Sequence, residues 1–102
     1  MNKILTQTLI VLMTSLLAFS AHATCKANSL GAVYCSKYSG GGASVNSLGS
    51  VECGKGQCAV NSLGSVKCSK VQGGGAAVNG LGTVKCFGGC EDGSEYMCVQ
   101  GK

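Results

Sequence analysis

The sequence predicts an all-β fold, a small tandem repeat of disulfide-stapled β-hairpins. Three observations lead to this expectation: the pattern Asn-x-Leu-Gly-x-Val-x-Cys occurs four times, the 102-residue chain contains eight cysteines, and apolar and polar residues alternate on either side of each Leu-Gly pair. Repetition at a fixed spacing is typical of folds in which each unit covers the apolar face of its neighbour. An even number of cysteines in a short exported chain is typical of a disulfide framework.

Residues 1–23 have the features of a signal peptide. Lys3 precedes an apolar stretch over residues 4–19, and residues 21–23 read Ala-His-Ala, the small-x-small pattern of a cleavage site. A membrane anchor is the alternative, but a spanning helix needs roughly 20 predominantly apolar residues, and this stretch is shorter and interrupted by threonine, glutamine and serine. We therefore expect cleavage before Thr24 and export to the periplasm or the extracellular space.

The exported chain is organised in pairs of repeats. The cysteines that end the four copies are unevenly spaced, with a longer, a shorter and again a longer interval, so the true period is a pair of copies. These cysteines are Cys35, Cys53, Cys68 and Cys86. Residues 25–53 and 58–86 form the duplicated pairs within a repeat domain over residues 24–90, and residues 91–102 form an acidic C-terminal cap. A glycine triplet inside each pair is expected to act as a corner or a flexible connector.

The third copy illustrates why each unit should be a hairpin. Asn61 at the first turn position and Gly64 at the fourth suit a type I turn followed by a residue of positive φ, the usual three-residue hairpin loop with a glycine bulge. Residues 62–64 then form the tip, and Val60 faces Val66. Because side chains alternate between the two faces of a strand, the cysteines and valines share one face, and the polar residues share the other.

The same register brings cysteines together in the first and third copies. Directly opposed residues of an antiparallel pair lie roughly 4.5–5.5 Å apart at Cα, within reach of a disulfide. The chain has few large apolar side chains for a core, and a disulfide that closes a loop of about 15 residues is worth roughly 3 kcal/mol. The sequence therefore predicts the pairs Cys25–Cys35 and Cys58–Cys68.

The remaining four cysteines must pair differently. In the second and fourth copies, the residue opposite the cysteine is Ala43 or Ala76. The tail over residues 90–98 contains an Asp-Gly turn signal, which favours a local bridge across the turn, and the two repeat cysteines that are left occupy equivalent positions in the two pairs of copies. The predicted pairs are Cys90–Cys98 and Cys53–Cys86, and the main competitors are Cys53–Cys58 and Cys86–Cys90.

A short β-solenoid is the alternative architecture. In a hairpin array the four repeat leucines lie at exposed tips, which argues against hairpins. In a solenoid with one copy of the repeat per rung, Val45, Leu48, Val51 and Cys53 would instead all point inward. The hairpin array is preferred because its opposed cysteines fall into register without adjustment.

Catalysis and cofactor binding are not expected. The chain beyond residue 23 contains no histidine, and three of its four acids, Glu91, Asp92 and Glu95, lie together in the tail, where a solvated cap explains them better than a catalytic pair. Four residues separate Cys53 from Cys58, and three separate Cys86 from Cys90, whereas thiol redox motifs and zinc knuckles typically have two residues between their cysteines. We therefore predict no enzyme and no cofactor, with a cysteine metal-binding protein as a further alternative.

Six lysines against the single Glu52 give residues 24–90 a net charge of +5. Such lysines attract anionic lipid or lipopolysaccharide, but lysine also keeps edge strands from pairing with other sheets. Nucleic acid is not an expected partner, because the chain has no arginine and no interleaved aromatic residues. A small cationic toxin or antimicrobial that acts on membranes is therefore the alternative function.

The favoured function is a structural or interaction module of the periplasm or the cell exterior. The repeated asparagines and leucines would form a ladder or an apolar ridge, suited to a protein or cell-surface partner or to another copy of the chain. Membrane contact is expected only in the toxin alternative. The candidate interaction residues are Asn28, Asn46, Asn61, Asn79, Leu30, Leu48, Leu63 and Leu81.

Overall fold

The structure is a computed structural model that describes residues 23–101, and it is all-β, as the sequence predicts. Residues 1–22, which hold nearly all of the predicted signal peptide, lie outside the described residues. Within residues 23–101 no helix is long and apolar enough to cross a membrane, and helical structure is confined to the 3-10 turn η1 (Glu95–Met97). The strands are β1 (Cys25–Ala27), β2 (Val33–Ser36), β3 (Ala43–Val45), β4 (Val51–Cys53), β5 (Cys58–Val60), β6 (Val66–Ser69), β7 (Ala76–Val78), β8 (Val84–Cys86), β9 (Cys90–Asp92) and β10 (Cys98–Gln100).

Each repeat forms an antiparallel hairpin. In chain order, hairpin 1 is β1–β2, hairpin 2 is β3–β4, hairpin 3 is β5–β6 and hairpin 4 is β7–β8. Hairpin 3 has the predicted register, with Cys58 opposite Cys68 at its base. Val60 faces Val66 next to the tip. The other three hairpins have the equivalent register, so the hairpin prediction is confirmed.

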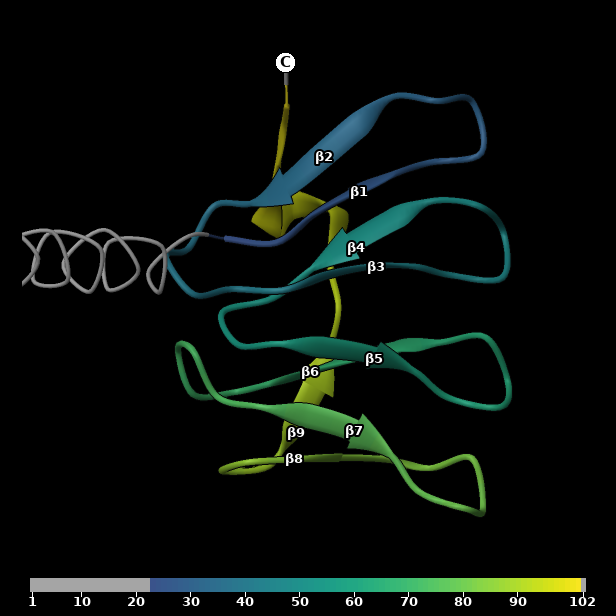
Figure 1. Cartoon of the computed structure of the whole chain (residues 1–102), viewed down its shortest axis with the longest axis vertical. Coiled ribbons are helices and arrows are strands. Elements are labelled where there is room, and N and C mark those ends of the chain that lie inside the picture. Colours follow the sequence, from purple (N-terminus) through teal and green to yellow (C-terminus); the bar gives the residue numbers. More distant parts are fainter. Residues whose placement is uncertain (1–22, 102) are drawn as a thin grey trace, which may run out of the picture.

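The hairpins stack one above another in the order of the sequence, with the tips at one side and the linkers at the other (Figure 1). Neighbouring hairpins contact each other through their first strands, so β1, β3, β5 and β7 lie side by side. Ladder hydrogen bonds run within each hairpin. The structure is therefore a hairpin array. The solenoid alternative would turn Leu48 inward, whereas this side chain is 86% exposed.

Two buried serines join neighbouring hairpins at their linker ends. Ser36 ends hairpin 1, and its Oγ donates to the Gly54 carbonyl, which follows hairpin 2, at 2.8 Å. Ser69 ends hairpin 3 and donates to the Phe87 carbonyl, which follows hairpin 4, at 2.6 Å. Because a buried hydroxyl without a partner is costly and both serines are buried, these hydrogen bonds help to specify how hairpin 1 meets hairpin 2 and how hairpin 3 meets hairpin 4.

Replacing Ser69 by alanine is expected to lower the free energy of unfolding by about 1–3 kcal/mol. The serine is fully buried, and its hydroxyl donates to the Phe87 carbonyl and accepts from the Val71 N–H, so the substitution removes the partner of two backbone groups. Urea denaturation of the disulfide-bonded protein measures the change. Ser65→Ala at an exposed tip is the control, and we expect it to stay within about 0.5 kcal/mol of the parent. An equal loss in both variants would contradict the prediction.

The C-terminal tail turns back and runs along the stack toward hairpin 1 (Figure 1, yellow). Its strand β9 pairs antiparallel with β6 of hairpin 3, and β10 pairs with β2 of hairpin 1. Between them, Ser94 bridges to Cys53 of hairpin 2 and caps η1 by accepting from the Tyr96 N–H. The segment predicted as an acidic cap, residues 91–102, therefore lies along three hairpins for as far as it is described.

Four disulfides cross-link the array, and together they use all eight cysteines. Cys25–Cys35 and Cys58–Cys68 are the predicted cross-strand pairs, with Cα atoms 3.9 and 4.0 Å apart. The preferred pairs for the other four cysteines are wrong, although Cys86–Cys90, named above as a competing pair, is present. In place of Cys53–Cys86 and Cys90–Cys98, the structure has Cys53–Cys98 and Cys86–Cys90.

The physical reason for this correction is that the chain consists of two equivalent halves. Cys53 and Cys86 are related by the duplication and occupy equivalent places in hairpins 2 and 4. Equivalent residues bond to equivalent partners rather than to each other. The tail supplies these partners, Cys98 for hairpin 2 and Cys90 for hairpin 4, with Cα separations of 5.3 and 5.1 Å.

The tail itself contains the sequence Cys-x-x-Gly twice, and both copies dock in the same way. The Gly93 N–H donates to the Val66 carbonyl at the start of β6 at 2.9 Å. The Gly101 N–H donates to the Val33 carbonyl at the start of β2 at 2.7 Å. Each half thus combines two hairpins with one tail segment. The first half comprises residues 24–53 and 98–101, and the second half comprises residues 58–86 and 90–93.

A small core lies between hairpin 1, hairpin 2 and the tail. Ala43, Val51 and Cys53 are buried, and Tyr34 and Met97 pack against them. Tyr34 belongs to the strand face that the alternation predicts to be polar, but in hairpin 1 its ring packs against the core residues of hairpin 2. Since the core contains so few large side chains, the disulfides are needed to hold the hairpins together.

Candidate interaction surface

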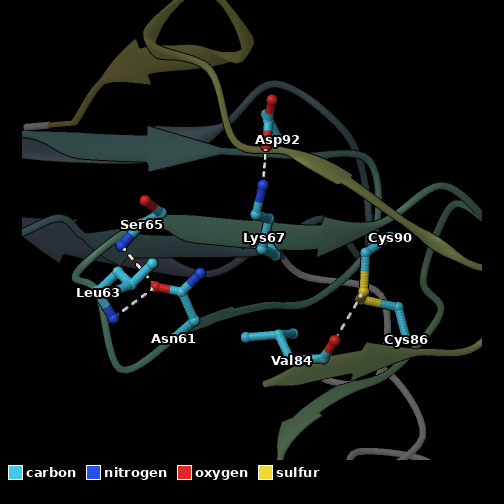
Figure 2. Close-up of polar contacts among 8 residues, drawn as sticks. All are labelled: Asn61, Leu63, Ser65, Lys67, Val84, Cys86, Cys90 and Asp92. Carbon is cyan, nitrogen blue, oxygen red and sulfur yellow. Dashed lines mark hydrogen bonds and ion pairs between the residues drawn. A yellow bond between two sulfur atoms is a disulfide. The ribbon is translucent and has the colours of Figure 1, made fainter. Parts of the chain in front are cut away.

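The asparagine of each repeat holds the hairpin tip in one conformation. In hairpin 3 the Asn61 Oδ1 accepts from the Leu63 N–H at 3.0 Å and from the Ser65 N–H at 2.9 Å (Figure 2). A side-chain oxygen that bonds to backbone N–H groups two and four residues further on fixes the loop between them. The same two bonds are made by Asn28, Asn46 and Asn79.

Backbone hydrogen bonds close each tip around a glycine. The Gly64 N–H donates to the Asn61 carbonyl at 3.0 Å, and the Asn61 N–H donates to the Ser65 carbonyl at 2.9 Å. Gly64 has a φ of 83°, in the left-handed region that glycine adopts without steric cost. The expected loop is present in all four hairpins. Its other glycines of positive φ are Gly31, Gly49 and Gly82.

The tips are also bonded to one another. The N–H of the residue that precedes each of the first three leucines donates to the tip glycine carbonyl of the next hairpin, at 2.9 Å in all three cases. This ladder holds the four tips in register. No feature of the sequence pointed to it, because the bonds run between backbone atoms. The three bonds join Ser29 to Gly49, Ser47 to Gly64 and Ser62 to Gly82.

The ladder aligns four leucine side chains in a row that faces solvent, which we call the leucine ridge. Leu30 is 91% exposed, Leu48 86%, Leu63 84% and Leu81 87%. The neighbours of these leucines in the sequence are serine and glycine, so the ridge is uncharged. Single leucines scattered over a surface are ordinary, but an aligned row of them is a feature of interaction sites.

The asparagines and leucines predicted to form one interaction surface have different places in the structure. The Oδ1 atoms of the asparagines are used inside the tips, and Asn46 also donates through Nδ2 to the Glu52 carboxylate at 2.6 Å. The leucine side chains extend beyond the tips. The asparagines therefore shape the surface, and the leucine ridge is its exposed apolar part.

Three of the six lysines of residues 24–90 lie at the opposite end of the hairpins, and the other three lie on strands. Lys37, Lys55 and Lys70 are exposed in the linkers, whereas Lys67 lies on β6 and pairs with Asp92 of β9 (Figure 2). Six residues, most of them extended, separate each linker lysine from the leucine of the preceding tip, which is roughly 20 Å at about 3.3 Å per residue. The leucine ridge and the linker lysines therefore do not form one amphipathic surface.

Several acids and all the cysteines have structural partners. Glu52 accepts from Asn46, and Asp92 pairs with Lys67. Every cysteine forms a disulfide, and Figure 2 shows the Cys86–Cys90 bridge beside hairpin 4. Among residues 23–101, no group of three or more His, Cys, Asp or Glu side chains could hold a metal ion.

Comparisons of the chain with protein-family models, with curated proteins and with solved structures find no match.

Proposed function

We propose that the protein is an exported, non-catalytic interaction module that binds a partner protein through the leucine ridge. The observation that carries the proposal is the alignment of four leucines, each 84–91% exposed, by the backbone ladder of the tips. Burying one leucine side chain is worth about 1.5–3 kcal/mol. A row of four that stays in water contributes little to the folding of a single chain, but it offers a partner a substantial apolar contact.

The shape of the leucine ridge suits an apolar groove on the partner. The ridge is one side chain wide and uncharged, and exposed serines at positions 29, 47 and 62 stand beside the leucines as a polar rim. The disulfides and the tip ladder hold the backbone of the leucines in place before binding. Little backbone conformational entropy is therefore lost when the partner docks.

The four disulfides are consistent with an oxidising, exported location. This location limits the partner to proteins and surface components outside the cytoplasm. It also explains how so small a core can support a rigid binding surface, because the cross-links do not depend on buried apolar area.

Two alternative functions are less well supported. A cationic toxin that inserts into membranes would place its lysines beside the apolar side chains, at the depth of the headgroups, whereas three of the six lysines of residues 24–90 lie in the linkers, at the other end of the hairpins (Figure 1), and Lys67 is paired with Asp92. A metal-binding protein would need thiolates, whereas the cysteines are paired in disulfides.

Replacing Leu48 and Leu63 together by serine is expected to weaken partner binding by about tenfold or more, because truncating apolar side chains at the centre of an interface costs at least about 1 kcal/mol each. Stability should change by no more than about 0.5 kcal/mol per site, since both side chains are exposed in the unbound protein. The partner is first cross-linked to the wild-type protein in a cell-envelope extract and purified. Titration calorimetry with wild type and variant then gives the two affinities.

Val71→Ser is the matched control, because Val71 is 44% exposed but lies in a linker, away from the tips. Equal affinity of the wild type and the ridge variant for the partner would contradict the proposed function. Vesicles of phosphatidylethanolamine and phosphatidylglycerol test the membrane alternative. If the wild type causes leakage and the ridge variant does not, the target of the leucine ridge is a membrane and not a partner protein.

A further inference from the structure

The two ends of the stack are complementary, and we propose that the protein assembles end to end, with hairpin 1 of one copy docked under hairpin 4 of the next. This proposal uses surfaces other than the leucine ridge and does not depend on the proposed function. It starts from the contact between the protein's own two halves, where hairpin 2 meets hairpin 3. Because hairpin 4 is equivalent to hairpin 2, and hairpin 1 to hairpin 3, a second copy can repeat that contact.

The backbone ladder of the tips ends in one unused donor and one unused acceptor. Where the halves meet, the Ser47 N–H donates to the Gly64 carbonyl at 2.9 Å. The equivalent donor on hairpin 4 is the Gly80 N–H, and the equivalent acceptor on hairpin 1 is the Gly31 carbonyl. Neither has a backbone partner within residues 23–101. A second copy would join these two groups and continue the ladder.

A glycine with free space beside it, Gly75, lies at the equivalent position on hairpin 4. Gly42 is buried where the halves meet, and a Cβ added to it would lie 2.5 Å from the backbone N of Cys58. Its equivalent, Gly75, is exposed, and a Cβ there would meet nothing within 4 Å. Residues 24–25 of another copy are equivalent to the residues that pack against Gly42. They would fill the space beside Gly75.

The exposure of the end strands points to the same contact. Where the halves meet, Ala43 on β3 is 3% exposed, and β5 is half-buried along its length. At the ends of the stack, all three residues of β1 are exposed, and so are Ala77 and Val78 of β7, the latter to 46%. These strands lack the neighbouring hairpin that covers their equivalents.

The tail leaves both end strands free. After β8 the chain turns toward the linker of hairpin 3, where the Lys70 N–H donates to the Gly89 carbonyl at 3.0 Å and Gly88 lies against Val71. The Cys86–Cys90 disulfide closes this turn. At the other end of the stack, β10 pairs with β2 and leaves β1 uncovered.

A head-to-tail contact of this kind does not close a dimer. However many copies are joined, the assembly still has a free hairpin 1 at one end and a free hairpin 4 at the other, so growth continues into a filament unless the rotation per copy closes a ring. Because the tips stay in register across the contact, the leucine ridges of successive copies would join into one row. A partner with several grooves would then bind with avidity.

Charge sets the conditions under which the ends meet. Lys26 on β1 and Lys85 on β8 are exposed at the two end hairpins, so docking brings like charges toward each other. Salt screens this repulsion, because the Debye length falls from about 30 Å at 0.01 M to about 3 Å at 1 M. We therefore expect association to strengthen as the salt concentration rises.

Sedimentation velocity and electron microscopy of the processed, disulfide-bonded protein test the proposal. The wild type should form elongated species that grow with protein concentration from micromolar to millimolar. Gly75→Ala should block growth, because its Cβ would meet the incoming residues 24–25. Gly80→Pro should do so independently, since it removes the donor at a turn position that favours proline. Each variant is expected to lower the association constant by about tenfold or more and to leave the monomer's melting temperature unchanged or slightly higher.

Leu81→Ser separates this contact from the leucine ridge, because it changes the same tip as Gly80 and should leave assembly intact. A wild type that stays monomeric at millimolar concentration in low and high salt overturns the proposal, and so does growth that persists in both glycine variants. Growth that is lost when Leu48 and Leu63 are replaced by serine but persists in Gly75→Ala would place the contact on the leucine ridge, and this result would also overturn the proposal. If the protein binds its partner but stays monomeric, the assembly proposal fails and the proposed function is retained.

Discussion

A variant with alanine in place of both Cys53 and Cys98 is expected to lose about 4 kcal/mol of unfolding free energy in the chain-entropy model. This disulfide spans 45 residues, the largest separation of the four, so its removal frees the unfolded chain most. Cys53 is also fully buried beside Ala43 and Val51, and the loss of its sulfur adds a packing defect. Urea denaturation with linear extrapolation measures the change.

The other disulfides supply the scale for this prediction. Cys25–Cys35 spans 10 residues and Cys86–Cys90 spans 4, so the same model gives losses of about 3 and about 2 kcal/mol for the corresponding double alanine variants. In the Cys53 and Cys98 variant alone, the amide hydrogens of β10 should also exchange faster, because the tail is released from hairpin 2. A loss no larger than that of the Cys86 and Cys90 variant would contradict the role assigned to this bridge.

The hairpins could be predicted from the sequence because every feature that specifies them is local. Asn61 and Gly64 are three residues apart, and the loop that they form depends on bonds within five residues. Once the loop is known, the antiparallel register that it sets places Cys58 opposite Cys68 without further information. The two cross-strand disulfides follow directly from that register.

The tail could not be predicted in this way, because its partners lie far away in the sequence. The Asp-Gly turn signal suggested a local bridge between Cys90 and Cys98, but the strands around it pair with β6 and β2 instead of with each other. The sequence does contain a weak signal, because the tail has Cys-x-x-Gly twice, although the same sequence also begins at Cys53 and at Cys86. Equivalent positions for Cys90 and Cys98 imply equivalent partners for Cys53 and Cys86.

The leucine ridge is the part of the candidate site for which the usual rule that large apolar side chains are buried gives the wrong expectation. Exposed leucines argued against hairpins, yet all four leucines face solvent. The turn chemistry of the asparagine and glycine places each leucine at the tip whatever its hydrophobicity, so local and global preferences conflict there. Such conflicts are concentrated at functional sites. The alignment of the leucines depends on backbone bonds between tips, which the sequence does not encode in any side chain.

Gly42→Ala and Gly75→Ala are expected to change stability in opposite directions, although the two glycines are equivalent in sequence. At Gly42 the new Cβ would lie 2.5 Å from a backbone nitrogen of hairpin 3, and separating the halves to relieve this overlap should cost about 3 kcal/mol. At Gly75 the Cβ meets open space, and the loss of glycine's freedom in the unfolded chain should raise stability by about 0.5 kcal/mol. Urea denaturation of dilute, monomeric protein measures both.

The opposite signs connect folding with assembly, because Gly42 is covered by the next hairpin of the same chain, whereas no hairpin of the same chain covers Gly75. In dilute solution nothing covers Gly75, so its alanine variant should be the more stable monomer. At high concentration the same methyl group opposes the docking of residues 24–25 of another copy, as a methyl at position 42 opposes hairpin 3. A Gly75→Ala monomer that is less stable than the parent would mean that this end face is already covered. If Gly42→Ala leaves the free energy of unfolding unchanged, the two halves do not pack through this glycine. The contact on which the assembly proposal is based would then be absent.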